Sequence, residues 1–397
     1  MATPGQVVGV GKLITPGGAQ GPKGDPGSAI PLADTTQNGL LKKVSGLTTD
    51  FVDGTNNCQN LLTVALPQTR QYNAIRNPTL RVAQRGASGS ASGYSLDGWL
   101  FGGGLAGAQW SQIVAAIPPD ISGNQWYPYT AYAYRVTFTT GKPTLTAADA
   151  CVLYQYIEGF LAEQLKGNPT SISLLVRATI PGTFAMALRD SATGYSYVTT
   201  GTIVSANTWT RIALPNVPIF PSAGNFPDGN VRCYDFLITP AIGSGHVSAT
   251  ANLNSWITGN FWGTTTQTNF AATANNTFDF TLVKHEPNPI CTPFVPRGIQ
   301  EEVVLNYRYL WYPGNFSYIG WIQNVNWTPE MGRITMPVPM RAVPTIMAGS
   351  IFSVSSGNAG SPALASASNS HVILYNNGAS WTPAAWAAFN GGFTAEL

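Results

Sequence analysis

The chain has 397 residues, of which 10% are charged, against roughly 25% in typical soluble domains. Its 20 Lys and Arg nearly balance its 18 Asp and Glu, which excludes the strongly basic surfaces that attract nucleic acid or anionic membranes. No stretch approaches the ~20 apolar residues of a membrane-spanning helix, and the N-terminus lacks the pattern of a secretory signal, so we expect cytoplasmic synthesis without membrane insertion.

Collagen-like Gly-x-y triplets occupy residues 18–26, and a further glycine follows. Gly18, Gly21, Gly24 and Gly27 stand at every third position, as the crowded axis of a three-chain helix requires. This pattern predicts a homotrimer held partly by these glycines. A flexible Gly/Pro linker is the alternative, because the chain contains 42 Gly and 29 Pro.

The region around the triplets shows little periodicity. We expect residues 1–60 to form an extended N-terminal anchor and residues 61–76 to form a linker.

Residues 77–296 have an all-β pattern. The segments 132–138, 171–177 and 278–283 alternate apolar and polar residues. Clusters of Gly, Pro, Asn and Asp punctuate such runs every ~8 to 15 residues. Many short strands at this spacing predict a jelly-roll β-sandwich rather than βαβ units.

Residues 297–397 predict a smaller, sandwich-like β module opened by a short helix. The helix is expected between Gly298 and Tyr309, with an apolar face made of Val303, Val304, Tyr307 and Leu310. The proline-rich segment 336–345 predicts an edge or a connection, and 371–375 predicts a strand that ends in a turn.

Residues for catalysis or metal binding are scarce. The three histidines form no paired metal-ligand spacing, and the four cysteines form no CxxC pair, so we expect no metal, no cofactor and reduced thiols rather than disulfides. Candidate glycosidase carboxylates are expected to be structural: Glu158, Glu163, Asp190 and Asp279. The sequence therefore predicts a protein that is not an enzyme, with no catalytic residue.

Aromatic residues make up 11% of the chain, and many lie in loop-like segments rich in Asn, Gln and Ser. Flat rings beside amides and hydroxyls suit the recognition of sugars. The predicted glycan-binding residues are Trp126, Tyr127, Tyr129, Tyr312, Tyr318, Trp321 and Trp327. The alternative is that these rings fill cores or pack between subunits.

A series of short motifs resembles tailed-bacteriophage fibre and spike proteins. Residues 77–86, followed by the Tyr-x-x-Asp-x-Trp segment 94–99, resemble the opening strands of the jelly-roll module in those proteins. Further stretches match the family in order: 155–159, 173–178, 207–211, 281–284 leading to 292–294, the helix segment 297–309, and 337–345. The chain departs from the family at Gly98, where an arginine is frequent.

The resemblance, which covers about residues 73–350, implies a trimeric virion appendage with a carbohydrate-binding-like jelly roll. Such a tail fibre or spike is assembled in the host cytoplasm, joins other virion proteins through residues 1–60, and attaches to host cell-surface polysaccharide. Two alternatives stay open: a head fibre or capsid decoration protein anchored by its N-terminus, and an enzyme that depolymerises capsule.

Overall fold

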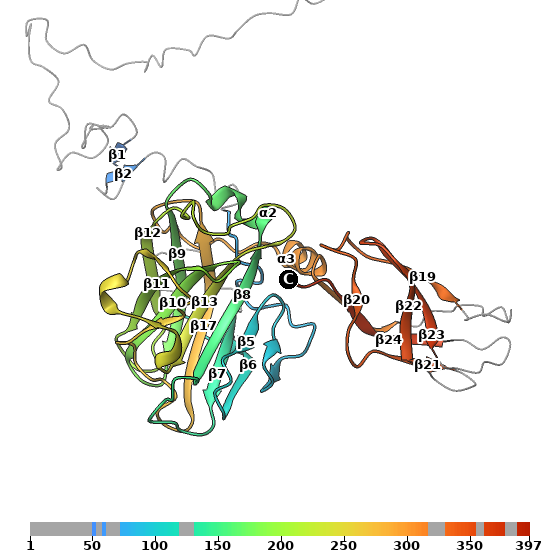
Figure 1. Cartoon of the computed structure of the whole chain (residues 1–397), viewed down its shortest axis with the longest axis horizontal. Helices are drawn as coiled ribbons and strands as arrows, with labels where there is room; N and C mark the ends of the chain where they lie inside the picture. Colours follow the sequence, from blue (N-terminus) through green and yellow to red (C-terminus); the bar gives the residue numbers. More distant parts are fainter. Residues whose placement is uncertain are drawn as a thin grey trace, which may run out of the picture. The chain divides into compact units, whose positions relative to one another are not determined.

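The structure, a computed structural model, describes residues 50–52, 58–60, 72–118, 131–316, 330–354, 361–377 and 387–397 (Figure 1). Strand β1 (Asp50–Val52) pairs with β2 (Cys58–Asn60). Residues 70–397 form one compact unit, and residues 1–69 belong to another. The collagen-like glycines lie outside the described residues, so their role in trimerisation stays a prediction.

Two antiparallel sheets form a jelly-roll β-sandwich, as the sequence predicted (Figure 1). The seven-stranded sheet has the order β15 (Trp256–Thr258), β11 (Tyr195–Ile203), β10 (Gly182–Asp190), β13 (Arg232–Ile242), β8 (Ala150–Glu158), β5 (Leu100–Gly102) and β4 (Gly93–Tyr94). The six-stranded sheet has the order β12 (Thr210–Val217), β9 (Thr170–Ala178), β17 (Asn276–Glu286), β7 (Ala131–Phe138), β6 (Ala108–Ala115) and β3 (Ser88–Gly89).

Short elements connect the strands of the sandwich. Helix α2 (Gly159–Ala162) and the turn η1 (Glu163–Leu165) follow β8, and neither was predicted from the sequence. The long segment between β13 and β17 contains η2 (Ser244–His246), β14 (Val247–Ser248), η3 (Thr250–Asn252) and β16 (Gly263–Thr264). Strands β14 and β16 pair in parallel.

The core between the two sheets is built from alternate side chains of both. Trp99 is fully buried there, with its ring centroid 4.9 Å from that of Phe280 and 6.3 Å from that of Phe236. Tyr134 stacks on Phe280 at 5.2 Å. Aromatic pairs add about 0.5–1.5 kcal/mol each beyond the burial of their area. The tryptophan of the Tyr-x-x-Asp-x-Trp segment therefore serves the core.

The C-terminal residues form two further sheets with a separate core. Strand β24 (Ala387–Thr394) pairs with β18 (Leu310–Phe316), β20 (Thr345–Ile346) and β21 (Ile351–Val354), and β23 (His371–Asn377) pairs with β19 (Glu330–Thr335) and β22 (Ser361–Ala367). Their shared core includes Ile334, Met340, Leu374 and Phe393. Residues 336–344 form a connection, as their prolines predicted.

Helix α3 (Ile299–Tyr307) forms where the sequence predicted a helix, but its buried face is different. Val304 is 48% exposed, whereas Glu302 and Asn306 are buried. The Glu302 carboxylate accepts hydrogen bonds from the backbone N–H of Asn77 at 2.5 Å and from Arg297 at 3.1 Å. The prediction of an apolar face was wrong because this helix packs against polar groups of the sandwich.

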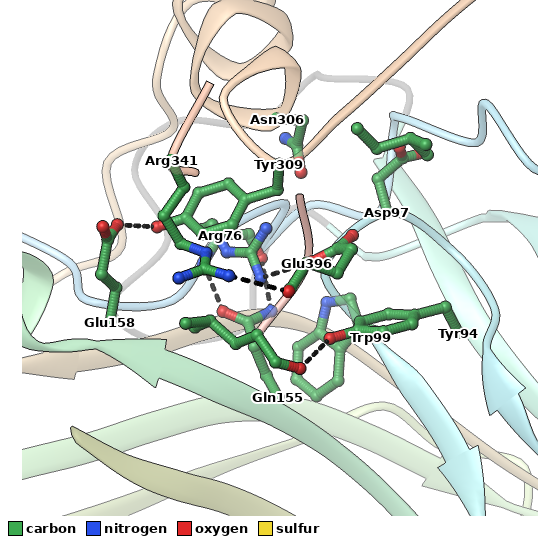
Figure 2. Close-up of polar contacts among 12 residues, drawn as sticks. Arg76, Tyr94, Asp97, Trp99, Gln155, Glu158, Asn306, Tyr309, Arg341 and Glu396 are labelled. Carbon is green, nitrogen blue, oxygen red and sulfur yellow. Dashed lines mark hydrogen bonds and ion pairs between the residues drawn. The ribbon is translucent and has the colours of Figure 1, made fainter. Parts of the chain in front are cut away.

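Charged side chains join the sandwich to the last residues of the chain (Figure 2). The Glu396 carboxylate pairs with Arg76 at 3.4 Å and with Arg85 at 3.2 Å. Arg341 donates to the backbone oxygens of Ala395 at 2.8 Å and Glu396 at 2.9 Å. Figure 2 shows Arg76, Arg341 and Glu396 gathered beneath helix α3. Residues from both ends of the compact unit therefore form one ionic junction.

Candidate functional site

Strand alternation places a polar row on the side of the seven-stranded sheet that is turned away from the core. On β10, Met186 and Leu188 point into the core, so Arg189 points outward. The register sets Arg189 opposite Asp235 on β13, and Asp235 opposite Tyr156 on β8. Three neighbouring strands thus present Tyr156, Asp235 and Arg189 side by side.

The adjoining part of the same face is apolar and covered. A second buried cluster contains Ala150, Val152, Ala185, Ala187, Val198 and Leu237, and Leu253, Phe261 and Trp262 of the long β13–β17 segment pack against it. Because this segment is fastened to the sheet, it brings Trp262, Asn260 and His246 next to the polar row. We term Tyr154, Tyr156, Arg189, Arg232, Asp235, His246, Asn260 and Trp262 the outer-face cluster.

Asp235 is the centre of the outer-face cluster and is fully buried. Its Oδ2 accepts hydrogen bonds from Arg189 Nε at 2.8 Å, from Arg189 Nη2, and from Arg232 Nη2 at 2.5 Å. Burial raises the pKa of Asp235, and the charges of Arg189 and Arg232 oppose that rise. Its other oxygen, Oδ1, has no hydrogen-bond partner among the described residues, and the same is true of the buried Arg232 Nε.

Aromatic rings flank the two arginines. The Arg232 guanidinium lies 4.3 Å from the ring centroid of Tyr156, and the Tyr154 and Tyr156 rings meet edge to face at 5.4 Å. On the other side, Arg189 lies 5.7 Å from the Trp262 ring, which stacks on His246 at 4.0 Å. These four aromatic residues are half-buried.

Asn260 fixes the side chains at the Trp262 end of the cluster. Its Oδ1 accepts hydrogen bonds from Arg189 Nη1 and from Trp262 Nε1, both at 2.7 Å. Its backbone oxygen lies 3.1 Å from His246 Nδ1. The rings and charges of this end are therefore held in place before any ligand arrives, which lowers the entropy cost of binding.

The six-stranded sheet carries a second arginine–aspartate cluster on its own outward side. Asp279 on β17 accepts from Arg135 Nε through Oδ1 at 2.8 Å and from Arg135 Nη2 through Oδ2 at 2.9 Å. Arg177 donates to Oδ2 through Nε at 3.0 Å and through Nη2 at 2.7 Å, and its guanidinium lies 4.7 Å from the ring of buried Trp209. Both oxygens of Asp279 are thus engaged within the chain.

Other chemistries find little support in the part of the chain that the structure describes. Within it, no three His, Cys, Asp or Glu residues come together as a metal site would need. No helix there has the length and apolar character to cross a bilayer. Cys151, Cys233 and Cys291 are free thiols in this structure, and burial raises the pKa of Cys233 to about 12.

Most of the predicted glycan-binding residues cannot be placed. Six of them lie outside the described residues: Trp126, Tyr127, Tyr129, Tyr318, Trp321 and Trp327. Tyr312 is described, on β18 of the C-terminal module, and is 39% exposed. The outer-face cluster, by contrast, belongs entirely to the sandwich.

All four candidate carboxylates were expected to be structural. Three of them, Glu158, Asp190 and Asp279, make such contacts. Glu158 pairs with Arg308 at 2.6 Å, and Asp279 holds two arginines. Asp190 accepts from the backbone N–H of Gly194 at 2.7 Å and of Asn225 at 2.9 Å, which shapes two turns. Glu163 opens the turn η1.

Sequence reasoning missed the outer-face cluster. One local signal was available, because the Tyr-x-Tyr pattern of residues 154–156 places two rings on the same side of a strand. The contact of Asp235 with Arg189 was not readable, since 46 residues separate them and the strand pairing that joins them is non-local.

Comparisons with known proteins yield distant similarities only. No protein family matches the sequence, and no curated protein is similar to it. Among solved structures, a putative sugar binding protein from Bacteroides thetaiotaomicron has 8% identity and a TM-score of 0.31, over 54% of this chain and 99% of that one. TmCBM61 in complex with β-1,4-galactotriose has 10% identity and a TM-score of 0.27, over 54% and 97%. The enzymatically active domain of bacteriophage CBA120 tailspike protein 4 has 11% identity and a TM-score of 0.24, over 54% and 21%. At these TM-scores, the case for a function depends on the residues of the chain itself.

Proposed function

We propose that this chain is a structural appendage of a tailed-bacteriophage virion, a tail fibre or spike, that binds host cell-surface glycan as a homotrimer. The observation that carries the glycan-binding part is the outer-face cluster, where half-buried rings flank charged groups that are already held in position. The sandwich, in this proposal, uses the outward side of its seven-stranded sheet as the binding surface.

The chemistry of the cluster suits a sugar. An aromatic ring offers a flat apolar surface for the C–H face of a pyranose, and the half-buried Tyr156 and Trp262 are the rings of the cluster proposed to supply it. Carboxylate, guanidinium and amide groups beside the rings exchange hydrogen bonds with sugar hydroxyls. Single sites of this kind bind weakly, and linking three of them raises the avidity without any new contact.

The virion part of the proposal draws on the sequence. The ordered motifs resemble phage fibres and spikes, and the triplets at residues 18–27 have the spacing of a three-chain helix. In this proposal residues 1–60 anchor the trimer to other virion proteins. Light scattering tests the trimer: a mass near three times the 42.1 kDa chain is expected, and a monomer would contradict it.

The second candidate is a head fibre or capsid decoration protein, which the N-terminal anchor would suit equally well. Immunogold labelling of intact virions separates the two. Label on the tail supports the fibre or spike, and label on the head supports the alternative.

Binding to a panel of purified bacterial surface polysaccharides tests the glycan site. We expect Tyr156→Ala and Trp262→Ala each to weaken binding about tenfold, which corresponds to about 1.4 kcal/mol. Tyr312→Ala tests in the same assay the one predicted glycan-binding residue that the structure describes, an exposed ring of the C-terminal module. A loss with Tyr312→Ala alone would move the site to that module, and reducing ends released by the protein would show catalysis instead.

A further inference from the structure

The two carboxylate oxygens of Asp235 differ in the number of hydrogen bonds that they accept. Oδ2 accepts three hydrogen bonds from Arg189 and Arg232, whereas Oδ1 accepts none from the described residues. Arg232 Nε is likewise buried without a partner there. Because buried polar groups of native proteins are almost always hydrogen-bonded, this acceptor and this donor each have room for a partner beyond those that the described residues supply.

A pair of neighbouring hydroxyls supplies what both groups lack. A hydroxyl can donate one hydrogen bond and accept two. One hydroxyl can donate to Asp235 Oδ1 while the oxygen of the next accepts from Arg232 Nε. The Arg232 side chain is 26% exposed and donates to Asp235 through Nη2, so it forms the part of the cluster through which a ligand can reach Asp235.

An anionic ligand fits this arrangement less well. The guanidinium of Arg189 is committed to Asp235 and Asn260, and Arg232 donates to Asp235. A sugar carboxylate placed against Arg232 Nε would also lie near the buried, unpaired Oδ1 of Asp235, a like charge, which is costly.

We infer that the outer-face cluster takes an uncharged glycan through two neighbouring hydroxyls, with Asp235 accepting from one and Arg232 donating to the other. This inference depends on the proposed function, since it names the ligand class of the proposed glycan site.

The first test uses the full wild-type chain and three forms of each polysaccharide that it binds. These are the native form, a carboxyl-reduced form in which any uronic acids become neutral hexoses, and a periodate-oxidised form in which vicinal diols are cleaved. We expect carboxyl reduction to leave the dissociation constant within about threefold and periodate to raise it at least about tenfold. A loss on carboxyl reduction, or no effect of periodate, would overturn the inference and leave glycan binding intact. Failure of every polysaccharide to bind would overturn the proposed function itself.

The second test assigns the contact to Asp235. Asp235→Asn keeps the size of the side chain but replaces one acceptor oxygen with a donor, and we expect binding to weaken at least about tenfold. Asp279→Asn makes the same change in the second cluster and should leave binding unchanged, with thermal unfolding as the check on both variants. Equal affinities of the two variants would exclude Asp235 as the contact, and the three polysaccharide forms decide the ligand class even where Asp235→Asn does not fold.

Discussion

Each outward side of the sandwich carries an aspartate, two arginines and an aromatic ring. The two sides differ in how many of the aspartate's oxygens accept hydrogen bonds. Asp279 lies between Arg135 and Arg177 with both of its oxygens engaged. Asp235 lies between Arg189 and Arg232, and among the residues that the structure describes only its Oδ2 accepts hydrogen bonds. Both oxygens of the first aspartate are therefore engaged, whereas one oxygen of the second has no partner among those residues.

The aromatic rings beside the two clusters also differ in how deeply they are buried. Arg177 lies over Trp209, which is 6% exposed, so the ring beside Asp279 is part of a core. Arg232 and Arg189 lie over Tyr156 and Trp262, which are half-buried. The comparison separates a cluster whose hydrogen bonds are complete within the described residues from one that, in our proposal, completes them with a ligand.

The largest expected effect is a difference in stability between the alanine variants of the two aspartates. Without that difference, the contrast between the two clusters would not hold. Asp279→Ala leaves two arginines without their common partner and should cost about 3 kcal/mol of unfolding free energy. Asp235→Ala also removes a buried oxygen that has no partner, which offsets about 1–2 kcal/mol of its cost. Denaturant unfolding at neutral pH measures both, and equal losses would show that the two aspartates are structurally equivalent.

An intermediate effect is expected on the pH dependence of stability. It determines the pH range in which the stabilities of the two clusters can be compared. Burial lowers the pKa of His285 from 6.5 to about 3. The unfolded chain therefore binds a proton between these values while the folded chain does not, so this stability is complete above pH 6.5 and declines toward pH 3. The loss is at most about 1.4 kcal/mol per pH unit, or about 2 kcal/mol at pH 5.

Asp235 acts in the opposite direction, since its raised pKa favours the folded state as pH falls through that pKa. His285→Gln should flatten the acid-dependent loss in unfolding experiments at several pH values. An unchanged pH profile in that variant would show that His285 is not the group responsible, and comparisons of the two aspartates belong above pH 7 in either case.

The smallest expected effect is on the stability of variants in which one arginine of each cluster is replaced by lysine. Arg135 donates two hydrogen bonds to Asp279, one to each oxygen. Arg135→Lys cannot make this two-point contact and should lower the unfolding free energy by about 1 kcal/mol. Arg232 donates one hydrogen bond to Asp235, and Arg232→Lys should stay within about 0.5 kcal/mol. Thermal unfolding of both variants checks the order, and the reverse order would contradict it.

The sequence was sufficient for the fold and insufficient for the site, for a physical reason. Alternation along segments such as 132–138 depends on the two faces of one strand, so it predicted β7 (Ala131–Phe138) and the sandwich. The clusters depend on which strands become neighbours. Arg135 and Asp279 are 144 residues apart, and their meeting is fixed by the fold as a whole.

Helix α3 shows the same limit within one element. Its existence and position were predicted, yet its buried face was not, because buried Glu302 is hydrogen-bonded to Asn77, Arg297 and Asn306. A pattern of apolar residues cannot reveal a face whose partners are polar and distant. The aromatic residues chosen from loop-like segments stay predictions, apart from the position of Tyr312.

The ionic junction between Arg76 and Glu396 has a mechanical consequence. These residues are 320 positions apart, yet they form a direct ion pair near the two ends of the compact unit. Tension that enters at residue 72 and leaves through the C-terminal strands can therefore pass along a short path through Arg76, Glu396 and Arg341. A pull between these two ends of the compact unit would therefore load the Arg76–Glu396 ion pair directly.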